Sequence, residues 1–369
     1  MTDVHAATHT ADVHFGGPDL PPRQLRNVLA AHVQAVPTGG TIDWVTYYFR
    51  DRGLAAALLD AARRGVTVRV TIDGHPRTEH ANDRIVATLS GPGGLRDGIR
   101  VVHLRKVPTP AGRFDRPHLH EKLYCFSHPQ PVAFVGSFNP SGDDPEEDHT
   151  LLQQIGDHDR GDNALVGFGD PILVDGLVAH ARWIHATRVP GLLGSLCPVN
   201  RDLVSGPTRV SFLPRLGFHP VVRLLRRLGP AARVRIASSH IKGNGVVRVL
   251  VELAQRVAAV EVIAEPTLRR VPTATEERLR SAGIAFRRLG TPDGYPMHNK
   301  FLLADDGPRR WVAFGSFNWT TRSFWLNREI CAVSEDEALV QAFADRWQTL
   351  DRRAGAGTPA PAATQAGMA

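Results

Sequence analysis

One short motif occurs twice in this chain, and the repetition constrains the fold more than any other feature. The first copy is His120-Glu121-Lys122 followed by Gly136-Ser137-Phe138-Asn139, and the second is His298-Asn299-Lys300 followed by Gly315-Ser316-Phe317-Asn318. Side chains two residues apart on an extended strand project from the same face, so each copy presents a His and a Lys together. The sequence therefore predicts two similar halves that share one site.

The segments ahead of the two motifs also correspond. Strands are expected at residues 41–51 and 233–243, each followed by an amphipathic helix, at 54–64 and 246–256. Further pairs of strands are expected at 66–73 and 260–265 and at 99–104 and 284–289, and helices at 22–36 and 218–228 open the halves. Arg50 and Lys242 occupy equivalent positions in this alignment. Alternating strands and helices in each half predict a layered α/β architecture.

Composition along the chain suggests where the halves begin and end. We expect a first half at residues 13–200 and a second half at 205–352, joined by a helix at 171–187 and a Gly- and Pro-containing stretch at 189–207. The segment 354–369 consists mainly of Ala, Gly, Pro and Thr, so it is expected to be a disordered tail.

Lysine is rare in this protein, and its positions are informative. Among 44 Lys and Arg residues only four are lysines, and two of these, Lys122 and Lys300, lie in the motifs; the others are Lys106 and Lys242. A compact ammonium with rotatable donors suits a crowded phosphate site in which a planar guanidinium does not fit. The lysines therefore indicate a phosphate-binding site.

An HxK sequence followed by GSxN, twice in one chain, resembles the phospholipase D superfamily. The second copy also has Asp305, Asn327 and Glu329 at the expected places, whereas the first has Ser127 in place of the Asp and Thr150 in place of the Glu. The resemblance implies an α/β fold of two similar α/β/α halves, related by a pseudo-twofold axis, with the active site between them. It does not specify the substrate.

The resemblance also implies a reaction, a metal- and cofactor-independent attack on a phosphodiester that forms a phosphohistidine. The residues expected to be catalytic are His120, Lys122, Asn139, His298, Lys300, Asn318 and Glu329. We expect His120 to attack phosphorus and Glu329 to orient His298 as the acid; the pseudo-symmetry leaves the reverse assignment open. His120 has no evident carboxylate of its own, and Asp148 is the nearest acidic candidate.

A second group of residues is expected to contact the substrate: Ser137, Ser316, Lys106, Lys242 and Tyr295. Two loops, at 105–119 and 290–297, directly precede the motif histidines and are expected to shape the pocket. The acidic run at 143–148 lacks a repeated ligand spacing, which favours a solvated loop over a metal site.

The formal net charge of +7 favours anionic partners, and both phospholipids and nucleic acids qualify. We favour a phosphodiesterase that hydrolyses or transfers phosphatidyl groups at a phospholipid headgroup bond. A nuclease with the same chemistry on DNA or RNA is the second hypothesis, and a phosphate-binding module without turnover is the third. The chain lacks a basic low-complexity arm, which argues against a nuclease.

Location and assembly follow from what the sequence lacks. Residues 1–11 show no signal-peptide pattern and no apolar run approaches the length of a membrane span, so we expect a cytoplasmic monomer. Three cysteines do not make a disulfide framework, and Cys125 and Cys331 are expected to be small buried hydrophobes. The helix at 218–228 could make a peripheral membrane contact, but we favour core packing for it.

Overall fold

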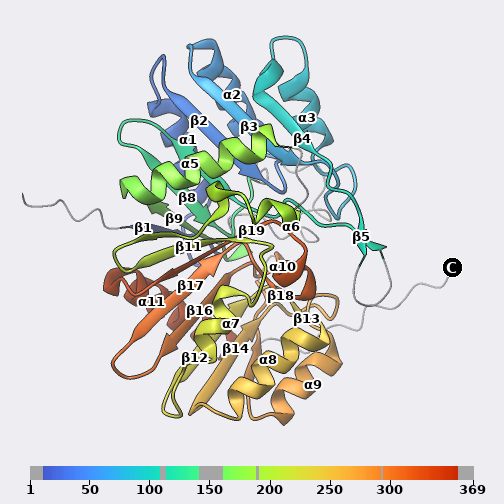
Figure 1. Cartoon of the computed structure of the whole chain (residues 1–369), viewed down its shortest axis with the longest axis vertical. Coiled ribbons are helices and arrows are strands. Elements are labelled where there is room, and N and C mark those ends of the chain that lie inside the picture. Colours follow the sequence, from blue (N-terminus) through green and yellow to red (C-terminus); the bar gives the residue numbers. More distant parts are fainter. Residues whose placement is uncertain (1–10, 109–113, 141–160, 188–190, 292–293, 356–369) are drawn as a thin grey trace, which may run out of the picture.

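Two β-sheets, each with helices on both faces, make up the protein (Figure 1). The computed structural model describes residues 11–108, 114–140, 161–187, 191–291 and 294–355. Within these residues no helix is long and apolar enough to cross a membrane.

The first sheet has seven strands, in the order β1-β9-β8-β7-β2-β3-β4. β2, β3 and β4 are parallel, and every other neighbouring pair is antiparallel. The strands span Asp12–Phe15 (β1), Thr41–Thr46 (β2), Thr67–Asp73 (β3), Ile99–Val102 (β4), Leu123–Phe126 (β7), Val132–Gly136 (β8) and Ala164–Phe168 (β9).

The second sheet has eight strands, in the order β10-β11-β19-β17-β16-β12-β14-β15. They span Leu203–Ser205 (β10), Thr208–Leu213 (β11), Arg233–Ser238 (β12), Ala259–Ala264 (β14), Ala285–Arg288 (β15), Lys300–Asp305 (β16), Arg310–Gly315 (β17) and Glu329–Ser334 (β19). From β15 to β11 their pairings are parallel and antiparallel in the same sequence as those from β4 to β1. The second half therefore repeats the first strand for strand and adds β10, which confirms the expected duplication.

Two short pairs of strands lie outside the large sheets. β5 (Val107–Pro108) pairs with β6 (Phe114–Asp115), and β13 (Ile241–Lys242) pairs in parallel with β18 (Trp319–Thr320).

Strand residues alternate between the two faces of a sheet, and the apolar residues on the outer face of each sheet are buried by helices. On the first sheet these are α1 (Gln24–Ala35), α2 (Arg52–Arg63) and α3 (Asp83–Ser90), packed on alternate strand residues such as Ile42 and Trp44. On the second they are α7 (Pro220–Leu225), α8 (Asn244–Ala254) and α9 (Thr273–Ser281). Val221, Val222 and Leu225 of α7 are buried, so the prediction of core packing for this helix is confirmed.

The inner faces of the two sheets contribute to one continuous core. α5 (Pro171–Ala186) packs on the first sheet and α11 (Glu337–Gly355) on the second. Between α5 and β10 lies the short helix α6 (Gly191–Gly194), and α10 (Thr321–Trp325) precedes β19. The chain passes from the first sheet to the second between α5 and β10. The expected tail lies outside the described residues from 356 onward, and its first two residues end α11.

Candidate active site

The two motifs lie side by side because β8 of the first sheet contacts β17 and β19 of the second. His120 and His298, together with Asn139 and Asn318, line a single cavity of about 740 Å³. The expectation of one site shared by both halves is confirmed in this geometry.

The glycine of each GSxN motif is required by a close approach of two backbones. A Cβ atom at Gly136 would collide with the carbonyl oxygen of Ala164, and one at Gly315 with that of Ile330. Gly315 also has a φ of +143°, a conformation that side chains other than glycine rarely adopt. The following amides, of Ser137 and Ser316, donate to these same two carbonyl oxygens, at 2.9 and 3.0 Å.

His120 receives its carboxylate from the opposite half of the molecule. Its Nδ1 lies 2.8 Å from Oε2 of Glu329, which is fully buried at the start of β19. Glu329 also accepts hydrogen bonds from Ser316 Oγ at 2.5 Å and Asn327 Nδ2 at 3.2 Å. The backbone amide of His120 donates to the carbonyl oxygen of Arg328 at 2.9 Å. The prediction that Glu329 orients His298 is therefore wrong, because this carboxylate crosses to the first histidine.

His298 is hydrogen-bonded to the side-chain amide of Asn163. Its Nδ1 lies 2.9 Å from Oδ1 of Asn163, and Ser137 Oγ donates to the same oxygen at 3.1 Å. Because a carbonyl oxygen only accepts, Nδ1 of His298 carries the proton and its Nε2 is unprotonated. The backbone amide of His298 donates to Gly161 O at 2.6 Å, so this histidine too is held by the opposite half.

Asn163 was missed by the sequence analysis, which placed Thr150 opposite Glu329 by equal spacing from the motif serine. Thr150 and Asp148 lie outside the described residues. Asn163 directly precedes β9, the counterpart of β19, which begins at Glu329. The sequence feature that could have identified Asn163 is a polar residue directly before the apolar strand Ala164–Phe168. Glu329 is likewise a polar residue followed by apolar strand residues.

A buried ion cluster fixes the segment that carries Asn163. Asp162 is fully buried and accepts hydrogen bonds from Arg346 Nη2 at 2.6 Å and from Arg353 Nη1 and Nη2 at 2.6 and 2.9 Å. Both arginines belong to α11, and Arg346 also bonds to Asp19. The last helix of the second half thus positions the partner of His298.

The motif lysines lie behind the histidines. Lys122 and Lys300 are almost fully buried, and each ammonium donates to the carbonyl oxygen of its own motif histidine, at 2.6 and 2.9 Å. Of the motif asparagines, Asn139 accepts from the amide of Tyr48 at 3.3 Å. Oδ1 of the buried Asn318 has no hydrogen-bond partner among the residues that the structure describes.

Burial dominates the protonation of both histidines. It lowers the pKa of His120 to about 4, although the adjacent Glu329 acts in the opposite direction. Burial, with the positive charges of Lys300 and Arg270, lowers the pKa of His298 well below its usual value. The carboxylate of Glu329 therefore favours the charged form of His120, in opposition to burial.

The residues expected to contact substrate divide into three groups. Lys242 lines the cavity, and its contact with substrate stays a prediction. Ser137 and Ser316 do not line it, because their hydroxyls hold the partners of the histidines and accept from the amides of Ala164 and Ile330; the prediction of substrate contact is corrected to a positioning role.

Lys106 and Tyr295 also lie outside the cavity wall. Lys106 is exposed next to β5, and Tyr295 is half-buried in the loop before the second motif. We correct their assignment accordingly. The acidic run at 143–148 lies outside the described residues. Within those residues no group of three or more His, Cys, Asp or Glu side chains is arranged to bind a metal ion.

Comparisons with known proteins agree with this architecture. Residues 37–156 and 224–350 match the family model described as "Cardiolipin synthase, PLD-like domain", and the chain therefore belongs to this phospholipase D-like family. A curated relative, "Mitochondrial cardiolipin hydrolase" from Xenopus laevis, is 30% identical over 127 residues, which cover 34% of this chain and 58% of the relative.

Two solved structures share the fold across the whole molecule. Phosphatidylserine synthase from Haemophilus influenzae Rd KW20 superposes with a TM-score of 0.64 and 14% identity, covering 93% of this chain and 86% of that one. Polyphosphate kinase from Porphyromonas gingivalis gives a TM-score of 0.60 and 15% identity, covering 93% and 50%. At these identities the likeness establishes the fold alone.

Proposed function

We propose that this protein is a phosphodiesterase that hydrolyses or transfers phosphatidyl groups at a phospholipid headgroup bond through a phosphohistidine. The observation that carries the proposal is the pair of histidines facing one cavity with unlike partners, Glu329 for His120 and Asn163 for His298. A two-step displacement needs one nucleophile and one acid, and unlike partners suit the two histidines to these different roles.

The partners reverse the roles expected from the sequence. Nε2 of His298 is unprotonated, because Nδ1 donates to the amide oxygen of Asn163, and an unprotonated nitrogen is suited to act as the nucleophile. Glu329 favours the imidazolium of His120 through Nδ1 and so opposes the burial that lowers the pKa of this histidine; we therefore assign His120 as the acid.

The proposed reaction has two steps. His298 Nε2 attacks phosphorus, the bond to the headgroup oxygen breaks, and His120 gives its proton to that oxygen. In the second step neutral His120 takes a proton from water or an alcohol, whose oxygen attacks phosphorus and releases His298. Hydrolysis and transfer differ only in the acceptor.

Fixed positive charge stabilises the transition state in this proposal. Lys122 and Lys300 are buried immediately behind the histidines, and the amides of Asn139 and Asn318 line the cavity. Preorganised charges and dipoles in a site with little water are usually the largest catalytic contribution.

A phospholipid is favoured as substrate by the family description and by the curated relatives named as cardiolipin hydrolases. The alignment spans about half the length of several of these relatives or less, so their activity supports the proposal only indirectly. The basic wall of the cavity would also suit a nucleic acid, which keeps a metal-independent nuclease as the alternative.

A side-by-side assay separates the two. Purified protein is given labelled phosphatidylglycerol, phosphatidylcholine, single-stranded DNA and duplex DNA, each with EDTA present. We expect headgroup release from a lipid, and a loss of at least ~10²-fold in both His120→Asn and His298→Asn. Cleavage of DNA alone would replace the lipid assignment, and near-normal activity in either variant would contradict the shared site.

A further inference from the structure

A second cavity lies at the far end of the second sheet from the catalytic site. It has a volume of about 460 Å³, and none of the residues that line it lines the catalytic cavity. Glu329 begins β19, whereas Glu335, directly after this strand, lines the second cavity, so about 20 Å of strand separates the two sites. A concave site of this size is typical of small-molecule binding.

Part of this cavity is built by a segment that the duplication does not include. Asp202 and Val204 lie just before and within β10, the strand that the second sheet adds to the repeated unit. The lining residues from Asp202 to Arg223 also lie between the two regions that the family model matches, 37–156 and 224–350. The cavity is therefore an addition to the shared fold.

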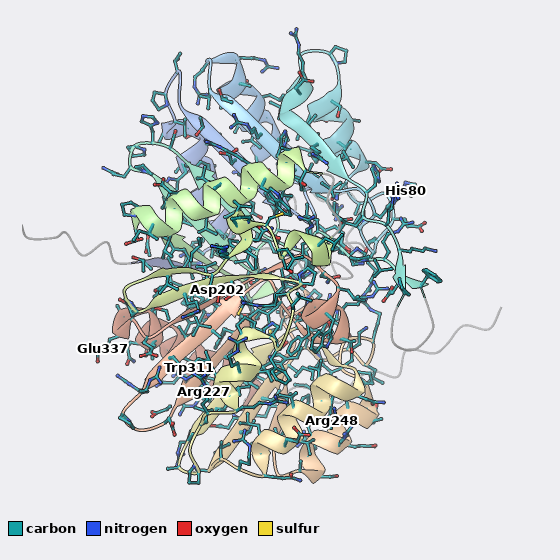
Figure 2. All side chains as sticks on the ribbon, viewed as in Figure 1. His80, Asp202, Arg227, Arg248, Trp311 and Glu337 are labelled. Carbon is teal, nitrogen blue, oxygen red and sulfur yellow. The ribbon has the colours of Figure 1, made fainter. Side chains whose placement is uncertain are left out.

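Arginine dominates the wall of the cavity. Among the described residues, five arginines line it against two acidic residues, Asp202 and Glu335; the arginines are Arg209, Arg215, Arg223, Arg227 and Arg309. Figure 2 shows Asp202, Trp311 and Arg227, which all line the cavity, on one face of the second half. The wall therefore carries an excess of positive charge.

The two acidic residues are already paired. Asp202 accepts from Arg209 Nη1 at 3.0 Å and from Arg215 Nη1 at 2.6 Å, and Glu335 accepts from Arg309. Burial raises the pKa of Asp202, but its arginine partners hold this pKa below its usual value, so the carboxylate stays charged. The excess charge therefore belongs to the other two arginines.

Arg223 and Arg227 have no acidic side chain within 4.0 Å in the part of the chain that the structure describes. Both are exposed, and they lie four residues apart at the end of α7, a spacing at which like charges repel. Beside them Val204, Leu224 and Trp311 give the cavity an apolar side, and Val204 is 49% exposed. The cavity thus combines two unpaired guanidiniums with an apolar wall.

We propose that this cavity binds a phosphate monoester, with the phosphate on Arg223 and Arg227 and the apolar group of the ester against Val204 and Leu224. A phosphate monoester carries up to two negative charges at neutral pH, which matches the two unpaired arginines. The guanidinium fork also fits phosphate oxygens in pairs. A soluble phosphate ester and a lipid with a terminal phosphate share this chemistry. The inference does not depend on the proposed function, because the cavity is separate from the catalytic one.

The test follows the modification of single arginines by phenylglyoxal, which is slowed where a ligand covers the guanidinium. Modification is measured by mass spectrometry with phenyl phosphate, with inorganic phosphate, and with potassium chloride at the same ionic strength. Vesicles of phosphatidylcholine with and without phosphatidic acid form the membrane arm. Arg226, exposed beside Arg227 but outside the cavity, is the internal control.

We expect phenyl phosphate to protect Arg223 and Arg227 but not Arg226, and inorganic phosphate to protect them only at higher concentration, because it lacks the apolar contact. Arg227→Gln should raise the concentration of phenyl phosphate that half-protects Arg223 by about ten-fold or more, the usual effect of losing a hydrogen bond to a charged group. Arg226→Gln should change that concentration by less than ~two-fold.

The two sources of the ligand give different patterns. Protection by phenyl phosphate supports a soluble ester, and protection only by vesicles that contain phosphatidic acid supports a lipid phosphate. Equal protection of Arg226 in every arm would show that the anions only screen the surface. That result, or protection no greater than that given by potassium chloride, would overturn the proposal.

Discussion

Replacing Glu329 with glutamine removes one negative charge from the site and almost no volume. The wild-type carboxylate is fully buried and accepts from His120 Nδ1 at 2.8 Å, Ser316 Oγ at 2.5 Å and Asn327 Nδ2 at 3.2 Å. A glutamine keeps the packing but loses the charge that stabilises the imidazolium of His120. A hydrogen bond to a charged group contributes about 1.5–3 kcal/mol, which corresponds to a rate loss of about 10- to 150-fold.

The loss should depend on the leaving group, because His120 supplies its proton. We expect the full loss for a phosphatidyl ester of an ordinary alcohol and only a few-fold loss, about three-fold, for a nitrophenyl ester, whose leaving group needs little protonation. The first-turnover burst of nitrophenol isolates the first step. Glu335→Gln, at an exposed position just after the same strand, is the matched control. Equal losses for both esters would show that Glu329 acts only as a structural residue.

Four further substitutions test the partner of His298, the motif lysines and the burial of His219. Asn163→Asp places a carboxylate beside His298 and should raise its pKa, so kcat/KM should gain an acidic limb at higher pH than in wild type; an unchanged pH profile would contradict the role of this contact. Lys122→Arg and Lys300→Arg should lose nearly as much turnover as alanine variants with unchanged circular dichroism, because the planar guanidinium does not fit the buried sites; near-normal turnover would mean that the lysines provide only diffuse charge. Burial lowers the pKa of His219 to about 3, so its contribution to stability is complete above the unfolded pKa of about 6.5 and is lost as pH falls toward 3. The free energy of unfolding of His219→Asn should therefore decline less between pH 6.5 and 4 than that of wild type, by ~1.4 kcal/mol per pH unit, and parallel declines in denaturant titrations would refute this.

Much of the fold could be predicted because each strand and helix can be recognised from a short stretch of sequence, and the duplication provides each stretch twice. Strand alternation and helix periodicity give the same elements in both halves, and every major strand that the repeat analysis expected is present. The strands expected at 41–51 and 233–243 are shorter than predicted, because β2 ends at Thr46 and β12 at Ser238. The pairing of β1 with β9 and of β11 with β19 could not be predicted this way, because it joins segments far apart in the chain.

The site was predicted in its residue types but not in its connections. His120 and His298 were found from the motif, but their partners come from the opposite halves, and sequence order does not show which half faces which histidine. Equal spacing led to Thr150, but β9 begins further from Ser137 than β19 does from Ser316, so the two segments differ in length. Asn163 could be identified only once β9 was paired with β8.

The two lysines outside the motifs, Lys242 and Lys106, illustrate the same limit. Nothing in the sequence distinguishes these two lysines from each other. In the structure Lys242 lines the cavity, because it ends β13 just before α8, whereas Lys106 is exposed beside β5. Whether a side chain is buried, and whether it lines a cavity, depends on the folded chain and cannot be read from the residue type.

Trapping the covalent intermediate tests the central claim most directly. Protein in excess over a phosphatidyl substrate labelled at phosphorus is quenched rapidly and digested under conditions that keep a phosphohistidine intact. We predict label on the peptide that contains His298, and longer-lived label in His120→Asn with a nitrophenyl substrate, because water then lacks its base. Label on the His120 peptide would reverse the two roles, and the absence of label under single-turnover conditions would contradict covalent catalysis at this site.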